Sequence, residues 1–233
     1  MINGSNGHTD SGGRNDLYPW GEDRTPRAAR GLNVRAALRS GAPIGNEEFD
    51  DLLPEPIRAK SRIFWTPLDV ALRASKMLVS EPGFRVLDVG SGAGKFCVVG
   101  ALATEGEFVG IEQRAPLVEC ARDLAALVGA TRATFTHGVF DALDPKNFDG
   151  FYFFNPFEEN KFRDSSMSES DALRAENRFR TDVRNAQRFL RAARDGARVV
   201  TYNGLGGRMP RTYSLLHSVE LGCTLELWVK DRG

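Results

Sequence analysis

The stretch VLDVGSGAGKF, residues 86–96, constrains the fold of this 233-residue chain more than any other segment. An apolar run ends at Val89. Glycines then occupy every second position, as Gly90, Gly92 and Gly94, before a helical stretch begins. Glycine lets the backbone turn tightly and approach a ligand without a Cβ in the way. In doubly wound α/β sheets such a loop lies at the carboxyl ends of the strands, where ligands bind. The segment therefore predicts a strand, a ligand-binding turn and a helix.

Short apolar runs alternate with helical stretches through the rest of the chain. The predicted strands cover residues 85–89, 107–111, 133–137, 150–154 and 197–202. The predicted helices between them cover residues 94–104, 115–128 and 171–194. This alternation indicates βαβ units and a mostly parallel sheet. The last segment, residues 213–230, is rich in β-branched and aromatic residues around Gly222, which predicts a closing antiparallel pair. The fold class is therefore α/β, with a doubly wound, Rossmann-like, mostly parallel seven-stranded sheet.

The region before this sheet divides by composition. Residues 1–30 are rich in Gly, Asn, Asp, Ser and Arg, and they lack the apolar residues that an ordered segment buries, so we expect a disordered tail. Residues 31–80 have a helical pattern, with a short helix over 33–40, and are predicted to form an N-terminal helical cap. Residues 81–233 then form the main domain.

Three kinds of ligand compete for a glycine loop of this kind. A phosphate-binding P-loop requires G-x-x-x-x-G-K-[ST], but Val89 stands five positions before Gly94, and Phe96 replaces the hydroxyl residue. A dinucleotide-binding loop requires G-x-G-x-x-G, but Lys95 occupies the position of the third glycine, which packs the helix. The pattern that remains is an acidic residue followed by G-x-G-x-G.

Two acidic residues accompany this loop. Asp88 lies two residues before the first glycine, where its carboxylate is badly placed for a diphosphate and well placed for the ammonium end of an amino-acid-like ligand. Glu112 ends the second predicted strand, about 20 residues beyond the loop, a position from which a carboxylate accepts hydrogen bonds from a ribose diol. A ligand with a ribose and an ammonium group fits both residues, and S-adenosylmethionine carries both groups.

The sequence DVGSGAGKF, followed by GIEQR, resembles the first two motifs of class I S-adenosylmethionine-dependent methyltransferases. The similarity covers approximately residues 60–203. It implies an enzyme that binds S-adenosyl-L-methionine and transfers its methyl group to an acceptor. The residues to which it assigns the cofactor are Asp88, Gly90, Gly92, Gly94 and Glu112. Two alternatives from other classes stay open, namely a non-catalytic cofactor-binding module and a nicotinamide-dependent oxidoreductase, which Lys95 disfavours.

The adenine end of the cofactor is assigned less directly. The third predicted strand ends in THGVFDAL, residues 136–143. The family often has an acidic residue just after the glycine of this segment, where it meets the adenine amino group, but Val139 holds that position here. Adenine is then held by the backbone of Val139 or Phe140, by packing of the Phe140 ring, or by Asp141. A solvated turn residue is the equal alternative for Asp141.

The fourth predicted strand leads into Asn155-Pro156-Phe157, where class I enzymes place the groups that face the reacting methyl. The motif resembles both the [DN]-P-P-[YF] of methyltransferases that modify amino nitrogens and the Asn-Pro-Phe of uncharacterised bacterial members. In the amino-directed enzymes an Asn oxygen and a Pro carbonyl accept the two N–H groups, and the aromatic ring stacks on the substrate, which aims the nitrogen lone pair at the methyl. The resemblance implies that Asn155, Pro156 and Phe157 are catalytic, with an amine or amide nitrogen of protein, nucleic acid or a small molecule as acceptor. This chain lacks the second proline, and a proline turn that ends a buried strand is the alternative.

Upstream, FWTPLDVA (residues 64–71) is similar to the aromatic-x-T-P segment that covers the methionine end of the cofactor in several amino-directed methyltransferases. Thr66 is placed to hydrogen-bond the ligand carboxylate. An ordinary N-cap for a helix that starts at Pro67 is compatible with that role.

The charge balance bears on the partners. Lysines and arginines total 31, and so do aspartates and glutamates. Zero net charge argues against bulk nucleic acid as a dominant partner, although it permits a local basic patch. Several arginines share a face of the helix predicted over residues 171–194, which favours a solvated helix face over a docking surface for nucleic acid.

Cysteine usage and hydropathy bear on location. The three cysteines, Cys97, Cys120 and Cys223, have no metal-ligand or redox-motif spacing, so we predict reduced thiols, no metal site and a cytoplasmic protein. No apolar run reaches the roughly 18 residues that span a bilayer, so no membrane partner is expected.

Overall fold

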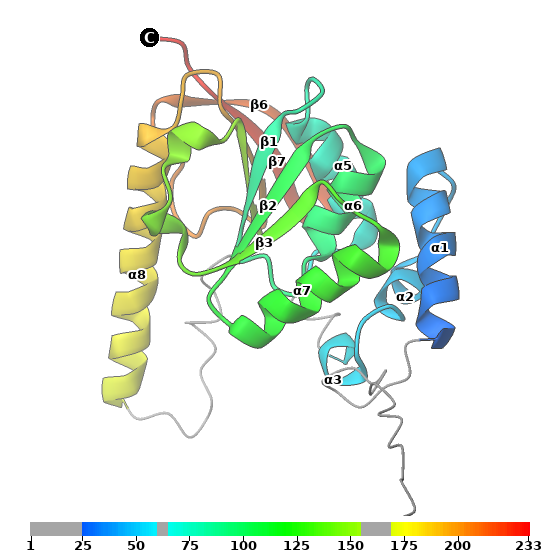
Figure 1. Cartoon of the computed structure of the whole chain (residues 1–233). Helices are drawn as coiled ribbons and strands as arrows, with labels where there is room; N and C mark the ends of the chain where they lie inside the picture. Colours follow the sequence, from blue (N-terminus) through cyan, green and yellow to red (C-terminus); the bar gives the residue numbers. More distant parts are fainter. Residues whose placement is uncertain (1–24, 60–64, 155–168) are drawn as a thin grey trace, which may run out of the picture.

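The computed structural model describes residues 25–59, 65–154 and 169–233, and its centre is a seven-stranded sheet of order β3-β2-β1-β4-β5-β7-β6 (Figure 1). The strands are β1 (Arg85–Val89), β2 (Glu107–Glu112), β3 (Ala133–His137), β4 (Gly150–Phe154), β5 (Arg198–Tyr202), β6 (Tyr213–Leu221) and β7 (Cys223–Lys230). The first five strands are parallel, and β7 pairs antiparallel with β5 and β6. The predicted fold class and the predicted closing antiparallel pair are confirmed.

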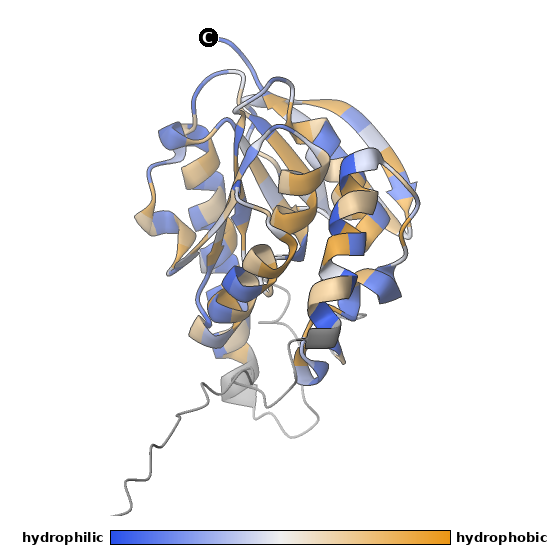
Figure 2. Ribbon diagram, turned by 45° about the vertical axis from the view of Figure 1, so that its right-hand side comes forward, coloured by the Kyte–Doolittle hydropathy of each residue, from blue (hydrophilic) through white to orange (hydrophobic). Residues whose placement is uncertain are grey.

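Helices cover both faces of this sheet. The α-helices are α1 (Thr25–Ser40), α2 (Asn46–Asp50), α3 (Glu55–Arg58), α5 (Leu68–Leu78), α6 (Lys95–Ala103), α7 (Ala115–Val128) and α8 (Glu169–Ala192), and the short 3-10 helices are η1 (Phe140–Ala142) and η2 (Pro145–Asn147). Helices α5, α6 and α7 contribute to one buried cluster and α8 to a second, on opposite faces of the sheet. Coloured by hydropathy, the helices show mixed apolar and polar faces, as expected of elements that cover a core on one side only (Figure 2).

Strand β1 shows why the sheet is covered twice. Val86 belongs to the cluster beneath α5 and α6, whereas Leu87 and Val89 belong to the cluster beneath α8. Successive side chains of a strand point to opposite faces, so an apolar run buried along its length requires cover on both. The run VLDV therefore forms a central strand, paired with β2 on one side and β4 on the other.

This topology has a switch point in its strand order, and doubly wound sheets have their ligand crevice outside such a point. From β1 the chain moves outward to β2 and β3, and then returns to place β4 on the other side of β1. The two directions separate at the carboxyl ends of β1 and β4, where Val89 is in register with Phe153. Ligands of doubly wound sheets bind at such switch points. The glycine loop leaves β1 at this position.

Helix α1 begins earlier than the sequence predicts. The expected tail extends to residue 30 and the expected helix covers residues 33–40, but α1 spans Thr25–Ser40. Val34 and Leu38 are buried, and α1 contacts α6 and α7. Packing against these helices stabilises a segment whose composition alone resembles a disordered one. Residues 1–24 lie outside the described part of the chain.

Candidate cofactor site

The glycine loop is tied to the neighbouring strand. Gly90 N and Ser91 N both donate to the carbonyl oxygen of Ile111 in β2, at 2.9 and 3.0 Å. Gly90, Gly92 and Gly94 have φ angles of 77°, 53° and 85°, a region that other residues rarely adopt. The alternating glycines therefore follow from the shape of the turn.

The three glycines face different surroundings. A Cβ on Gly90 would have no atom within 4 Å, so this side of the loop is open. A Cβ on Gly94 would lie 2.7 Å from both the Ala121 Cβ and the Phe135 ring. A Cβ on Gly92 would lie 2.9 Å from Trp65 Nε1. Gly94 thus packs the loop onto α7 and β3, Gly92 leaves room for Trp65, and Gly90 offers open space to a ligand.

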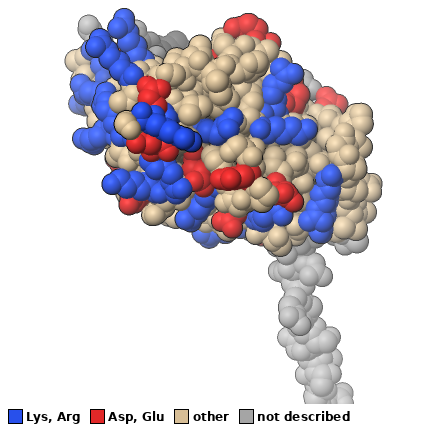
Figure 3. Space-filling view, turned by 90° about the horizontal axis from the view of Figure 1, so that it is seen from above, with Lys and Arg blue, Asp and Glu red and all other residues tan. Residues whose placement is uncertain are grey.

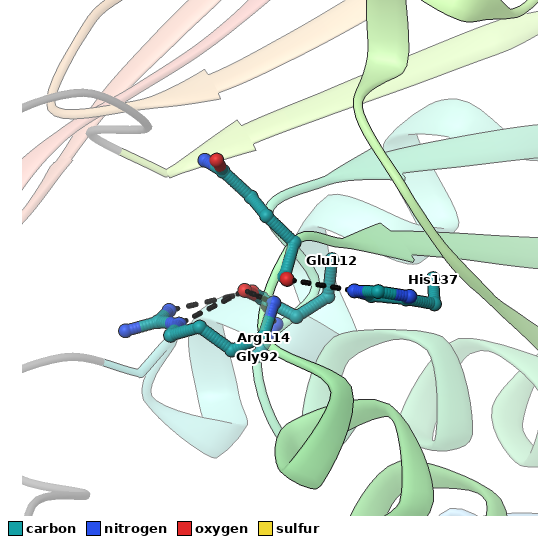
Figure 4. Close-up of polar contacts among 5 residues, drawn as sticks. Gly92, Glu112, Arg114 and His137 are labelled. Carbon is teal, nitrogen blue, oxygen red and sulfur yellow. Dashed lines mark hydrogen bonds and ion pairs between the residues drawn. The ribbon is translucent and has the colours of Figure 1, made fainter.

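Glu112 ends β2 beside this loop, with 2% of its surface exposed. Its Oε2 accepts from Gly92 N at 3.0 Å, and its Oε1 accepts from Arg114 N at 3.0 Å and from Arg114 Nε at 2.9 Å (Figure 4). His137 Nε2 lies 2.9 Å from the carbonyl oxygen of Gln113, which ties the tip of β3 to the tip of β2. The carboxylate is therefore held rigidly against the glycine loop by backbone and guanidinium donors.

Asp88 lies deeper than its position before the loop suggests. Asp88 is only 4% exposed, and its Oδ2 accepts a hydrogen bond from Cys97 Sγ at 3.4 Å. Burial raises the pKa of Asp88 from 3.8 to about 7; the Cys97 hydrogen bond opposes this shift, and the charge of Glu112 adds to it. Burial also raises the pKa of the Cys97 thiol well above its usual value, so the thiol is the proton donor of the pair.

Thr66 is not the N-cap that the sequence predicts. Pro67 holds the N-cap position of α5 and makes no side-chain capping bond, whereas the Leu68 amide donates to Asn46 Oδ1 at 2.8 Å. The Thr66 hydroxyl is buried and lies 2.9 Å from the hydroxyl of Tyr152 in β4. Because Tyr152 pairs with Asp88 across the β1–β4 ladder, Thr66 is nevertheless brought to the crevice.

The residues predicted for adenine lie beyond the tip of β3. Phe140 opens η1, and its ring packs edge-on against Phe189 of α8, with centroids 5.4 Å apart. Asp141 is exposed, and its Oδ2 accepts from Asn185 Nδ2 at 3.3 Å. Both side chains therefore contact α8 in this structure.

Asn155, Pro156 and Phe157 lie outside the described residues. Strand β4 ends at Phe154, immediately before them, at the carboxyl edge of the sheet.

The sequence did not predict several contacts that shape the site, including the pairing of Lys95, which it considered only as the replacement of a glycine. Lys95 is buried beneath the loop and binds Asp50 and Asn46 of α2, while Trp65 packs on Gly92 and Tyr152 binds Thr66. The one available signal is a lysine that opens the otherwise apolar helix KFCVVGALA. Such a lysine requires an acidic partner, and the sequence does not show which of the many acidic residues supplies it.

The described ranges hold neither a membrane-spanning helix nor a cluster of metal-ligand side chains. None of the described helices has the length and apolar character needed to cross a membrane. In the part of the chain that the structure covers, no three His, Cys, Asp or Glu side chains gather as metal ligands.

Comparisons with known proteins agree with this geometry. Residues 80–204, more than half of the chain, match the family described as a methyltransferase domain. An RNA methyltransferase from Salinibacter ruber, solved with S-adenosyl-L-homocysteine, superposes with a TM-score of 0.53 at 21% identity, over 72% of this chain and 95% of that one. TrmN from Thermus thermophilus superposes with a TM-score of 0.54 at 19% identity, over 74% of this chain and 52% of that one. At these identities the two structures show a shared fold. No curated protein matches the chain.

The family match covers the glycine loop, Glu112 and the five parallel strands β1 to β5, and so includes the switch point of the sheet. The chain therefore belongs to the methyltransferase-domain family, as an S-adenosylmethionine-dependent methyltransferase.

Proposed function

We propose that this methyltransferase modifies an amine or amide nitrogen. The observation that carries the proposal is the position of Asn155-Pro156-Phe157 directly after β4, whose carboxyl end adjoins the end of β1 and its glycine loop. The loop that would bind the cofactor and the groups that would orient a nitrogen then follow two neighbouring strands, β1 and β4. The acceptor molecule is a protein, a nucleic acid or a small metabolite.

The residues present fit the cofactor. Gly90 leaves open space at the turn, and the Glu112 carboxylate at the tip of β2 suits a ribose diol. Asp88 and Thr66 border the crevice from β1 and from the start of α5, where they suit the ammonium and carboxylate groups of the methionine end. Phe140 and Asp141, just beyond β3, are assigned to the adenine.

Catalysis in this proposal is by positioning. When bound, the cofactor supplies an electrophilic methyl group on a sulfonium. The Asn155 side-chain oxygen and the Pro156 carbonyl accept the two N–H groups of the substrate, and Phe157 stacks on its planar part. Aligned by these groups, the substrate nitrogen would take the methyl group that the cofactor supplies and would lose a proton to solvent. Alignment of this kind supplies a large part of the barrier reduction for bimolecular transfers.

The test has two steps. Purified protein is incubated with cell extract and radiolabelled S-adenosylmethionine, and the label is traced to protein, RNA, DNA and small molecules. With the acceptor identified, we expect Asn155→Ala to lower turnover per folded molecule by a factor on the order of 10², with cofactor affinity within a few-fold of wild type. Asn147→Ala, at an exposed asparagine before the opposite end of β4, is the matched control.

Unchanged turnover in a folded Asn155→Ala protein would remove the motif from the mechanism, and with it the nitrogen acceptor. Equal loss of activity and of folded protein in that variant would instead support a proline turn that only ends the strand. Cofactor binding without transfer to any fraction would support a non-catalytic module.

We place the protein in the cytoplasm because its three cysteines are free thiols, two of them buried, which is typical of a reducing compartment. A nucleic-acid acceptor is not favoured over the others. The molecule seen from above carries basic and acidic side chains close together (Figure 3). On α8, Arg180 is paired with Glu176, and Arg194, just beyond its end, is paired with Asp149, which supports a solvated helix face.

A further inference from the structure

A buried ion pair joins the N-terminal helices to the glycine loop. Lys95 Nζ lies 2.7 Å from Asp50 Oδ1 and 2.8 Å from Asn46 Oδ1, and 5.5 Å from the centre of the Phe49 ring. The side chains of Lys95 and Asp50 are 4% and 13% exposed. All three partners of the lysine belong to α2, a helix 45 residues earlier in the chain.

The position of Lys95 is unfavourable for an unpaired cation. It is the first residue of α6, where the helix dipole repels positive charge, and it is the one charged residue of that helix. Burial lowers the pKa of Lys95, while the hydrogen bond and charge of Asp50 in α2, and then the charge of Asp69 in α5, oppose this shift. The hydrogen-bond partners of the ammonium both lie on α2, and Lys95 directly follows Gly94 of the glycine loop.

Asn46 extends this connection to the other side of the crevice. Its Oδ1 accepts from Lys95 Nζ and also from the Leu68 amide at the start of α5, each at 2.8 Å. Trp65, three residues before Leu68, is the side chain that packs on Gly92. One side-chain oxygen of α2 thus binds the starts of both α5 and α6. Helix α6 directly follows the glycine loop, and Trp65, just before α5, packs on it.

We infer that Asp50 and Asn46 are positioning residues of the cofactor site: acting through Lys95 and Leu68, they hold the glycine loop in the shape that binds the cofactor. The inference rests on the proposed placement of the cofactor at this loop. It assigns a function to helix α2, which lies outside the span that matches the methyltransferase family. In this proposal Asp50, Asn46 and Lys95 do not touch the reacting atoms.

The test compares cofactor affinity with stability in matched variants. Asp50→Asn removes the charge of the buried pair, and Asn46→Ala removes the bridging oxygen while leaving the ion pair. Asp51→Asn is the control, because it breaks an ion pair with Arg58 on the same cap in which both side chains are nearly half exposed. We expect Asp50→Asn and Asn46→Ala to raise the Kd of S-adenosylhomocysteine about tenfold, within the usual size of a coupling between sites, and Asp51→Asn to leave it within twofold.

A purely structural role predicts a different pattern. The double variant Lys95→Met with Asp50→Leu replaces the ion pair by apolar side chains, an exchange that often preserves stability. If the pair only stabilises the fold, both the Tm and the Kd of this variant return to wild-type values. If it positions the loop, the Tm returns and the Kd stays raised, because the hydrogen bond to Asn46 is not replaced.

Hydrogen exchange provides a readout that does not depend on the variants being active. Because coupling is reciprocal, S-adenosylhomocysteine should slow amide exchange in α2 of the wild type and have less effect in Asn46→Ala. Unchanged Kd in Asp50→Asn and Asn46→Ala, in a wild type that binds, would overturn the inference alone. A wild type that binds no S-adenosylhomocysteine would overturn the cofactor site as well.

Discussion

Asp88 combines two properties that act against each other at neutral pH. It is the acid that we propose for the ammonium group of the cofactor, and it is also buried, with its pKa raised to about 7. In the unfolded chain its pKa is near 3.8, so between these values the folded protein without cofactor holds a proton that the unfolded chain releases. The cofactor-free site therefore favours a neutral carboxyl, and the cation would favour the carboxylate.

This gives the protein without cofactor a defined pH dependence. The contribution of Asp88 to the free energy of unfolding has its full value below about pH 3.8, declines as the pH rises to about 7, and is constant above that value, where both states are ionised. Asp88→Asn has no such decline. We expect the Tm of this variant relative to wild type to rise between pH 4 and pH 7 and then level off. A Tm difference that does not change with pH would show that folding does not raise the pKa of Asp88.

Alanine substitutions separate the roles of the glycines. All three loop glycines have positive φ, so each substitution carries the strain of a left-handed backbone, about 1–2 kcal/mol. Gly94→Ala also places a methyl group against Ala121 and Phe135, whereas Gly90→Ala places it in open space. We expect Gly94→Ala to lower the Tm more, and Gly90→Ala to weaken cofactor binding more than its loss of stability explains. Thermal melts and calorimetry check both, and a reversed order of the Tm losses would contradict the assignment.

At the scale of elements, α1 is an integral part of the fold. It packs on α6 and α7 through Val34 and Leu38, each 3% exposed, while Leu32 on the same helix is 62% exposed. Val34 and Leu38 belong to the same buried cluster as α5, α6 and α7, so α1 extends the layer of helices on that face of the sheet.

A pair of leucines in α1 measures this contribution. Leu38→Ala removes a buried side chain and should lower the free energy of unfolding by about 2–5 kcal/mol. Leu32→Ala removes an exposed one and should change it by less than about 0.5 kcal/mol. Denaturant unfolding of both variants checks the difference. Equal effects would mean that α1 does not pack on the domain in solution.

The sequence predicted those parts of the molecule that depend on local pattern. The strands β1 to β5 were found because apolar runs bounded by turns are a local signal, and β1, β3 and β4 have the predicted ends. The start of α1 was missed because its stability comes from packing on α6 and α7. In the site, the glycine loop and Glu112 follow from spacing along the chain. The burial of Asp88 and the pairing of Lys95 with Asp50 do not, because depth and contacts across 45 residues are set by the tertiary fold.

At the scale of the whole molecule, the carboxyl edge of the sheet gathers the site. The glycine loop follows β1, Glu112 ends β2, and Asn155 follows β4 in the sequence. Asn46 of α2 binds Leu68 at the start of α5 and Lys95 just after the glycine loop. The chain as a whole carries balanced charge, with 31 basic and 31 acidic residues. The central claim is that Glu112 and the glycine loop form the cofactor site.

The most direct test of this claim is the Kd of S-adenosylhomocysteine, measured by calorimetry for wild type and Glu112→Ala, with NAD as the competing ligand. Glu107→Ala is the control, because it removes an exposed carboxylate at the opposite end of the same strand. We predict binding of S-adenosylhomocysteine but not NAD, a loss of about 1–3 kcal/mol of binding free energy in Glu112→Ala, and no loss in Glu107→Ala. NAD binding as tight as that of S-adenosylhomocysteine, or an unchanged Kd in Glu112→Ala, would contradict the account.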